Sequence, residues 1–104
     1  MKLIDGPAAE TFMVKRAPLF LRAVVDSQRG EKDVLDRLDD TPKATEKVFV
    51  YRLEGEAGWI HIYCSPRSKS GYYATGEYKF MPEVDGESVR TNEAWQTWVA
   101  SREL

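Results

Sequence analysis

The stretch Val48-Phe49-Val50-Tyr51-Arg52-Leu53 is the first of three apolar and aromatic segments that decide the fold of this 104-residue chain. The second is Trp59-Ile60-His61-Ile62-Tyr63-Cys64, and the third runs from Tyr72 to Met81. Their lengths and their β-branched and aromatic content are typical of strands, and breaks that contain glycine separate them. We therefore expect a β-meander with strands at about 47–54, 57–64 and 72–81, the first two joined by a tight hairpin turn at 55–58.

The segments on either side of the meander add one further strand and two helices to the prediction. Residues 18–25 fit a strand by their length, although their apolar side chains would also suit a short helix. Residues 31–39 and 92–102 both have the apolar spacing of a helix. The fold class that follows is α+β. A single domain is expected, in which a mainly antiparallel sheet of four or five strands packs with two helices.

Composition and charge limit the classes of function. The chain has 15 basic and 17 acidic residues and a net charge of −2, so no global positive field draws it to nucleic acid. Its one cysteine, Cys64, excludes an internal disulfide and suits a reducing compartment. No stretch approaches the ~20 apolar residues of a membrane-spanning helix, and the N-terminal apolar run is too short for a signal peptide. We expect a cytoplasmic protein with no membrane partner.

Alternation along the meander gathers aromatic side chains on one face of the sheet. That face is expected to carry Trp59, His61, Tyr63 and Tyr73, together with Arg52. Two interpretations remain open. Either the C-terminal helix covers the face with its own tryptophans, or the face binds a partner protein, for which aromatic residues and arginine are typical anchors. In the second case the candidate contact residues are Arg52, Trp59, Tyr63 and Tyr73.

A second candidate surface is acidic. Asp36, Asp39 and Asp40 lie at the end of the helix expected at 31–39. The three carboxylates either form a solvated face or contact a basic partner protein. A divalent cation is disfavoured, because oxygen-rich cation loops have a glycine at a sharp turn and this stretch has none.

The segment between the second and third expected strands is the best candidate for binding an anion. Arg67 and Lys69 supply positive charge, and Gly71 allows a ligand to approach the backbone. Tyr72 and Tyr73 follow, and tyrosine rings can stack on bases. Three interpretations of this segment remain open: a solvated hairpin loop, a contact with a protein, or weak binding of single-stranded nucleic acid.

Catalytic chemistry is sparse in this sequence. It has no glycine-rich phosphate loop, no paired Cys-x-x-Cys and no nucleophile elbow. His61 and Cys64 are three residues apart on a strand, so they point to opposite faces and do not form a nucleophile pair. A transition-metal site would have to be completed by carboxylates. We expect no cofactor and no metal, and a small enzyme that uses His61 as a general base is the weakest hypothesis.

Three successive runs of residues resemble small uncharacterised proteins encoded by actinobacterial phages. The runs are Arg16-Ala17-Pro18-Leu19-Phe20-Leu21-Arg22, Asp33-Val34-Leu35-Asp36-Arg37-Leu38-Asp39-Asp40 and Glu46-Lys47-Val48-Phe49-Val50-Tyr51-Arg52. The similarity covers about residues 15–80. It implies a compact accessory protein of a phage or prophage, and such proteins often bind a host factor or a defence component. The resemblance transfers no catalytic residues to this chain.

The function that these observations favour is a non-enzymatic protein-binding module that acts by occluding its partner. Either the aromatic face or the acidic residues would supply the contacts. A weak binder of single-stranded nucleic acid, using the segment 65–73, is the alternative. An exposed sheet edge would also allow the chain to form a homodimer.

Overall fold

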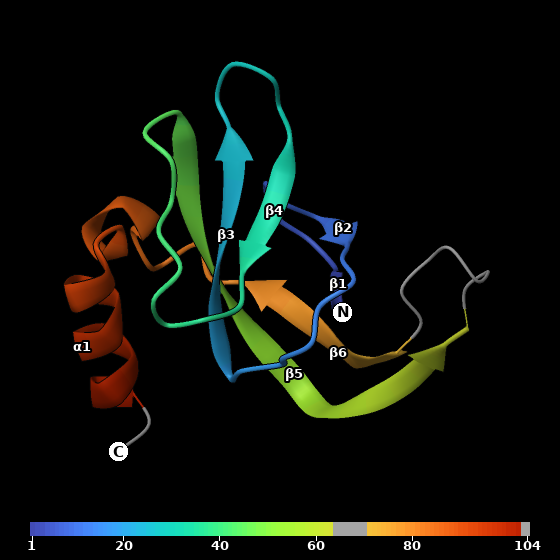
Figure 1. Ribbon diagram of the computed structural model, residues 1–104. Helices are drawn as coiled ribbons and strands as arrows, with labels where there is room; N and C mark the ends of the chain where they lie inside the picture. The colour runs from blue at the N-terminus through green and yellow to red at the C-terminus, as the bar shows by residue number, and fades with distance from the viewer. Residues whose placement is uncertain (64–70, 103–104) are drawn as a thin grey trace.

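Six strands form one mixed sheet in the computed structural model, which describes residues 1–63 and 71–102 (Figure 1). The sheet curls into a half-barrel with the strand order β2-β1-β6-β5-β3-β4. The β1–β6 pair is parallel and the other pairs are antiparallel. In chain order the elements are β1 (Lys2–Leu3), β2 (Glu10–Thr11), β3 (Phe20–Asp26), β4 (Lys32–Leu35), β5 (Glu46–Ile62), β6 (Gly71–Phe80), the 3-10 turn η1 (Gly86–Val89) and the helix α1 (Asn92–Arg102).

The predicted fold class is wrong in three respects. The sheet has six strands rather than four or five, it contains a parallel pair, and one α-helix with a 3-10 turn replaces the two expected helices. β1 and β2 escaped prediction because strands of two residues are too short to show alternation. The strand expected at 18–25 is confirmed as β3.

The helix expected at 31–39 is in fact the strand β4 followed by turns. Asp26 closes the β3–β4 hairpin, because its carboxylate accepts hydrogen bonds from the backbone N–H groups of Gln28 and Arg29 at 2.8 and 2.9 Å. Gly30 follows with a φ of +73°, a conformation that glycine adopts readily. Val34 is then buried in the core of the sheet. A nine-residue helix is marginal by itself, so tertiary pairing with β3 decides the structure.

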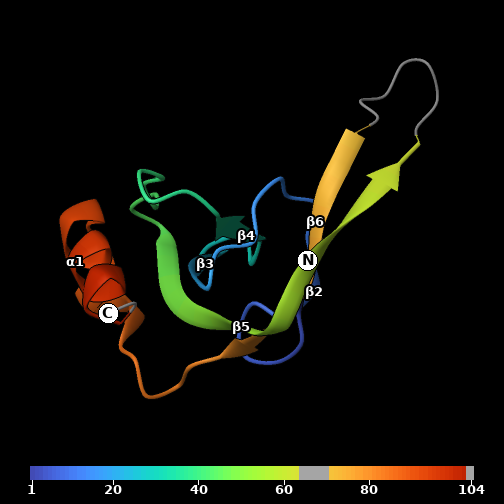
Figure 2. The ribbon, with the colours of Figure 1, turned by 90° about the horizontal axis from the view of Figure 1, so that it is seen from below.

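The hairpin turn expected at 55–58 is a bend inside one long strand. β5 advances four residues between Glu54 and Gly58, while its partner β6 advances only two, from Glu77 to Thr75. The extra residues form a bulge, in which Gly55 has a φ of +75°. Glycine inside a strand pattern marks a bulge as well as a turn, and the sequence did not distinguish them. Beyond this bend, β5 and β6 project from the sheet as a long hairpin (Figure 2).

Alternation divides the sheet into an inner and an outer face. The inner face carries Leu21 and Ala23 of β3, Tyr51 of β5 and Tyr78 of β6, which pack around Leu3 of β1. All five are almost completely buried. Full burial of one large apolar side chain contributes about 1.5–3 kcal/mol, so this cluster is a main source of stability.

The helix α1 packs on the outer face, and the helix expected at 92–102 is confirmed. Its Trp95 and Val99 are buried with Phe20 and Val50. Trp98 meets Phe20 edge to face, with ring centroids 4.9 Å apart. In Figures 1 and 2 the helix lies beside the first part of β5, far from the projecting hairpin.

A buried arginine joins β3 to the segment before α1 and to the turn after β4. Arg22 is fully buried. Its Nη1 donates to the carbonyl oxygens of Val89 and Arg90 at 3.2 and 2.7 Å, and its Nη2 donates to the carbonyl oxygen of Asp40 at 2.7 Å and to Asn92 Oδ1 at 3.1 Å. The planar fork of a guanidinium can satisfy several acceptors at once. Arg22 therefore fixes the turn around Asp40 against the start of the helix.

Candidate functional site

The strand register divides the aromatic face that the sequence predicted. His61 pairs with Tyr72, and Ile60 pairs with Tyr73. Trp59, His61 and Tyr72 therefore share the inner face of the hairpin, whereas Tyr73 lies on the other face with Ile60. The assignment of Tyr73 to the Trp59 face was wrong, because alternation within each strand does not give the register between two strands.

Large apolar side chains are exposed on both faces of the projecting hairpin. The exposed fractions are 64% for Trp59, 50% for Ile60, 87% for Tyr63 and 64% for Tyr72. These four make up half of the exposed large apolar residues in the described part of the chain. The interpretation that the C-terminal helix covers Trp59 is wrong, since α1 packs around Phe20 instead. We call these four residues the hairpin surface.

Arg52 lies apart from the hairpin surface. It precedes the bend of β5 and pairs with Phe20 of β3. Its guanidinium lies 6.0 Å from the centre of the Phe20 ring, on the outer face of the sheet. The grouping of Arg52 with Trp59 was wrong, because the bend at 55–58 separates the two parts of β5.

Trp59 also lines a groove of about 430 Å³, which contains a second predicted site residue, Asp36. From the sequence, these two residues were expected on separate surfaces. The other walls come from the segment before β3 and from the turn after β4, and we call this hollow the Trp59 groove. It is lined by Lys15, Arg16, Ala17, Pro18, Asp36, Arg37, Leu38 and Trp59.

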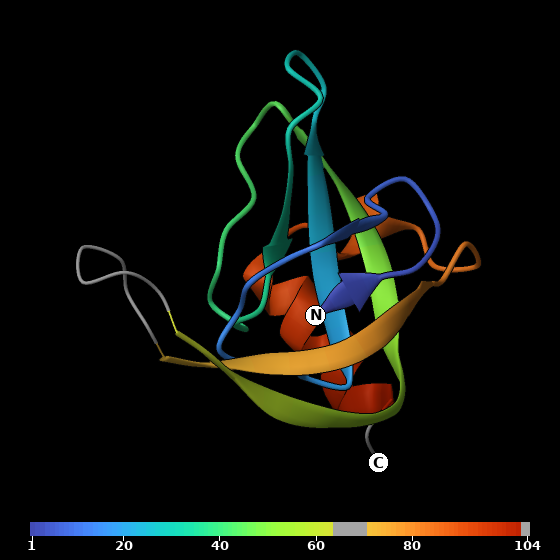
Figure 3. The same ribbon diagram turned by 90° about the vertical axis from the view of Figure 1, so that its right-hand side faces the viewer.

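The segment before β3 is held across the inner face of the sheet by backbone hydrogen bonds. The N–H group of Ala74 in β6 donates to the carbonyl oxygen of Val14 at 2.8 Å, and the N–H group of Leu53 in β5 donates to that of Leu19 at 2.8 Å. Between these anchors, the buried Tyr78 hydroxyl donates to the carbonyl oxygen of Pro18. Burial raises the pKa of Tyr78, so its hydroxyl keeps its proton. Figure 3 shows this segment crossing the sheet.

The turn after β4 is held by its own acidic residues and by α1. The Asp40 carboxylate accepts from the backbone N–H of Arg37 at 3.1 Å, and Gln96 of α1 donates to the carbonyl oxygen of Leu38 at 3.1 Å. The carbonyl oxygen of Asp39 accepts from the side chain of Asn92 at 3.0 Å. Asp40 thus has a structural role in placing Arg37 at the groove, and the three aspartates do not form the continuous helical face that was expected.

The groove places two arginines beside one shifted carboxyl group. Burial raises the pKa of Asp36, with a further contribution from Asp40, although Arg37 and Arg16 act in the opposite direction. Among residues 1–63 and 71–102, the guanidinium groups of Arg16 and Arg37 have no hydrogen bond and no ion pair. Their charge is therefore available to a ligand. Leu38, which is 52% exposed, adds an apolar contact.

Sequence reasoning missed Lys15, Arg16, Arg37 and Leu38 as site residues. Basic and apolar residues do occur at 15–16 and 37–38, but they are about twenty positions apart in the chain. Only the crossing of the N-terminal segment over the sheet brings them together. Lys15 extends further, since its Nζ donates to the carbonyl oxygen of Tyr72 at 3.2 Å and lies 3.8 Å from the centre of the Tyr73 ring.

The predicted anion-binding segment is placed only in part. Arg67, Lys69 and Cys64 lie outside the described residues. Tyr72 and Tyr73 are described, and they point to opposite faces of the hairpin rather than forming one stacking platform. The ring centroids of His61 and Tyr72 are 4.8 Å apart. His61 is exposed, and its ring lies near those of Tyr63 and Tyr72.

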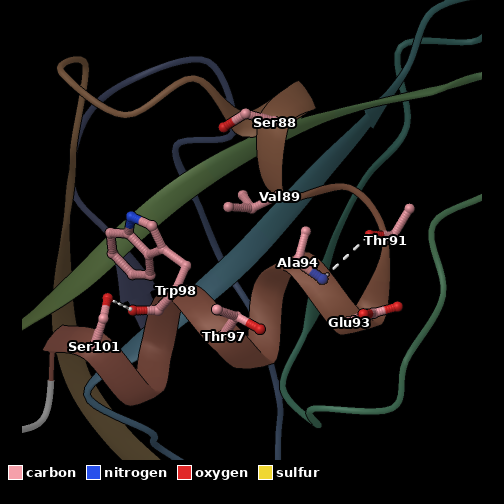
Figure 4. Close-up of a pocket in the computed structure, with 8 residues that line it drawn as sticks. All are labelled: Ser88, Val89, Thr91, Glu93, Ala94, Thr97, Trp98 and Ser101. Carbon is pink, nitrogen blue, oxygen red and sulfur yellow. Dashed lines mark hydrogen bonds between the residues drawn. The ribbon is translucent and has the colours of Figure 1, made fainter.

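A separate hollow of about 530 Å³ lies between η1 and α1 (Figure 4). Three of its four hydroxyl groups form hydrogen bonds within the chain: Ser88 and Ser101 donate to the carbonyl oxygens of Asp85 and Trp98, both at 2.7 Å, and Thr91 accepts from the N–H group of Ala94 at 3.2 Å. Through this hydrogen bond the Thr91 side chain caps the start of the helix. The hollow is lined by Ser88, Val89, Thr91, Glu93, Ala94, Thr97, Trp98 and Ser101. This set contains no nucleophile with an adjacent base.

Within the described ranges, no three histidine, cysteine, aspartate or glutamate side chains gather closely enough to hold a metal ion. In those same ranges no helix is long and apolar enough to cross a membrane. No protein-family model, no curated protein and no solved structure matches this chain.

Proposed function

We propose that this protein is a non-enzymatic protein-binding module that acts by occluding its partner through the hairpin surface. The observation that carries the proposal is the exposure of Trp59, Ile60, Tyr63 and Tyr72 on one projecting hairpin. Tryptophan and tyrosine are enriched among the residues that dominate binding energy at protein interfaces. Clustered exposed apolar side chains on a folded protein mark interaction sites more often than chance exposure does.

The rest of the sheet supports this proposal because it anchors the base of the hairpin. The first part of β5 is anchored between β3 and β6, so the hairpin is presented from a rigid base. A preformed surface loses little conformational entropy when it binds. The resemblance to phage accessory proteins extends the proposal, in that the partner would be a host or defence protein.

The test is affinity capture from a host-type lysate, with and without nuclease, read by mass spectrometry. The unchanged protein is compared with a Trp59→Ala, Tyr72→Ala double variant and with an Ile4→Ala control, since Ile4 is also exposed but lies off the hairpin. We expect the unchanged protein to capture one partner protein in stoichiometric amount, also after nuclease treatment. The Ile4→Ala control should capture the same partner, and the double variant should not. Capture of nucleic acid, or equal capture by all three proteins, would overturn the proposal.

A further inference from the structure

We propose that the free edge of β5 at Trp59–His61 accepts an extended acidic segment of the partner protein as an added strand. This inference rests on the proposed function and names the chemistry of the partner. Addition of a strand to an exposed sheet edge is a recurrent mode of peptide recognition, in which backbone hydrogen bonds supply affinity and neighbouring pockets supply specificity. Four observations carry the inference: a free edge, the direction of its backbone groups, the absence of charged residues and proline from that stretch of sequence, and the charge of the adjacent groove.

The edge of β5 is free along the projecting hairpin. β3 pairs with β5 only between Glu46 and Arg52. From Gly58 to Ile62, β5 pairs with β6 on one side, and no described strand pairs with it on the other. A row of unpaired backbone groups on a sheet edge is a template for pairing with another chain.

The contacts of β6 show which backbone groups of β5 face this free edge. The N–H group of Ala74 donates away from β5, to Val14, and the carbonyl oxygen of Tyr72 accepts from Lys15. In an antiparallel ladder, residues directly opposite each other exchange both hydrogen bonds or neither. The partners of Ala74 and Tyr72 are Trp59 and His61, which therefore direct their N–H and C=O groups to the free edge.

The free edge also lacks the features that normally prevent pairing. Natural edge strands are protected by charged side chains, above all lysine, or by proline. The run Ala57-Gly58-Trp59-Ile60-His61-Ile62-Tyr63 contains no lysine, arginine, aspartate, glutamate or proline. An edge without these protective residues is consistent with a surface that a bound partner covers.

The groove beside Trp59 selects an acidic strand. Arg16 and Arg37 face one carboxyl group there, that of Asp36, so the groove carries net positive charge. Leu38 and Trp59 provide apolar contact next to these charges. A strand with alternating acidic and apolar residues would direct its side chains toward this groove at every second position. Charge complementarity of this kind sets specificity and speeds association.

A second copy of the chain fits the edge less well than an acidic segment does. The run from Ala57 to Tyr63 contains no carboxylate that could meet the arginines of a facing copy. A nucleic-acid strand fits less well too, because phosphates cannot accept and donate in alternation as the edge groups of Trp59 and His61 require. Both occupants are outcomes of the experiment below.

The edge is tested with His61→Pro, which removes one N–H group that faces outward and leaves the β5–β6 ladder intact. Proline is tolerated on a sheet edge where its nitrogen faces solvent. The matched control is His61→Val, which removes the same imidazole and keeps the N–H group. Far-UV circular dichroism and thermal unfolding verify that both variants are folded.

The probe is a fluorescent peptide of alternating glutamate and valine, measured by anisotropy against the matching lysine–valine peptide and an oligothymidine strand. We expect the acidic peptide alone to bind. His61→Pro should weaken its binding about tenfold, because both a hydrogen bond and strand alignment are lost, whereas His61→Val should change it little. Arg37→Glu should weaken it and reduce its dependence on salt concentration.

Four results would overturn this inference. They are absence of binding to the acidic peptide at low salt, equal loss in the proline and valine variants, tighter binding of the lysine peptide or of oligothymidine, and a concentration-dependent dimer that His61→Pro abolishes. The affinity capture from lysate shows whether only the added-strand inference has failed or the proposed function as well. A partner that the hairpin captures and that His61→Pro retains would leave the protein-binding module standing and remove only the added strand.

Discussion

Arg22 is a buried cation whose hydrogen-bond acceptors are three backbone carbonyl oxygens and one side-chain amide oxygen. Burial lowers its pKa, and the negative charge of Asp40 partly offsets that effect. A buried charge without a contacting carboxylate is tolerated here because its acceptors converge on one fork. Arg22 thereby positions the turn that carries Arg37 to the groove, so a core residue determines the geometry of the candidate site.

Arg22→Met should lower the free energy of unfolding by about 3 kcal/mol, because it leaves several buried carbonyl oxygens without donors. Arg102→Met is the matched control, since Arg102 is exposed and its guanidinium lies 5.1 Å from the centre of the Trp98 ring. The control should cost less than about 1 kcal/mol. Urea titration measures both values, and a loss for Arg22→Met no larger than that of the control would contradict the structural role.

The raised pKa of Asp36 predicts that the stability of the protein depends on pH. Burial raises the pKa of Asp36 in the folded protein, so folding opposes its ionisation. Its contribution is fully favourable below the unfolded pKa of 3.8 and is lost as the pH rises through the raised folded value. Asp36→Asn should therefore raise stability at pH 7, by less than about 1 kcal/mol because the group is partly exposed.

Asp26→Asn is the control with the opposite sign. Hydrogen bonds from the backbone N–H groups of Arg29 and Gln28 lower the pKa of Asp26, so its contribution is present at neutral pH and is lost in acid. Urea midpoints between about pH 3 and pH 7 should show the Asp36→Asn gain shrinking in acid and the Asp26→Asn loss shrinking in acid. A gain for Asp36→Asn that did not change with pH would show that the substitution acts through packing.

At the scale of elements, the hairpin and the helix use tryptophan for different purposes. Trp59→Ala should change the free energy of unfolding by less than about 1 kcal/mol, because the side chain is mostly exposed. Trp95→Ala should cost about 3–5 kcal/mol, because it leaves a cavity beside Phe20 and Val50. Chemical denaturation of both variants measures the difference. Similar losses for the two would mean that Trp59 serves the core rather than a partner.

Local patterns in the sequence predicted some elements and not others. β3, β6 and α1 were predictable because each is long enough for alternation or helical spacing to show. β4 was missed because its two apolar residues, Val34 and Leu35, also fit a helix together with Leu38, and only pairing with β3 resolves that choice. The bend in β5 was taken for a turn because Gly55 and Gly58 suit either structure.

At the scale of the whole molecule, the curl of the sheet creates the candidate site. Trp59 and Asp36 were both predicted from the sequence as candidate contact residues. Their shared groove could not be predicted, since it depends on the bend of β5 and on the N-terminal segment that crosses the inner face. The net charge of −2 did not predict a positively charged groove either, because only the fold brings Arg16 and Arg37 together.

The most direct test of protein binding through the hairpin is amide hydrogen exchange, measured on the protein alone and with its captured partner. In the free protein, the outward amides of Trp59 and His61 should exchange rapidly, while those of Ile60 and Ile62 in the ladder with β6 should be slower. The partner should slow exchange along 59–62 and leave α1 unchanged. Protection confined to α1, or none on the hairpin, would contradict the account.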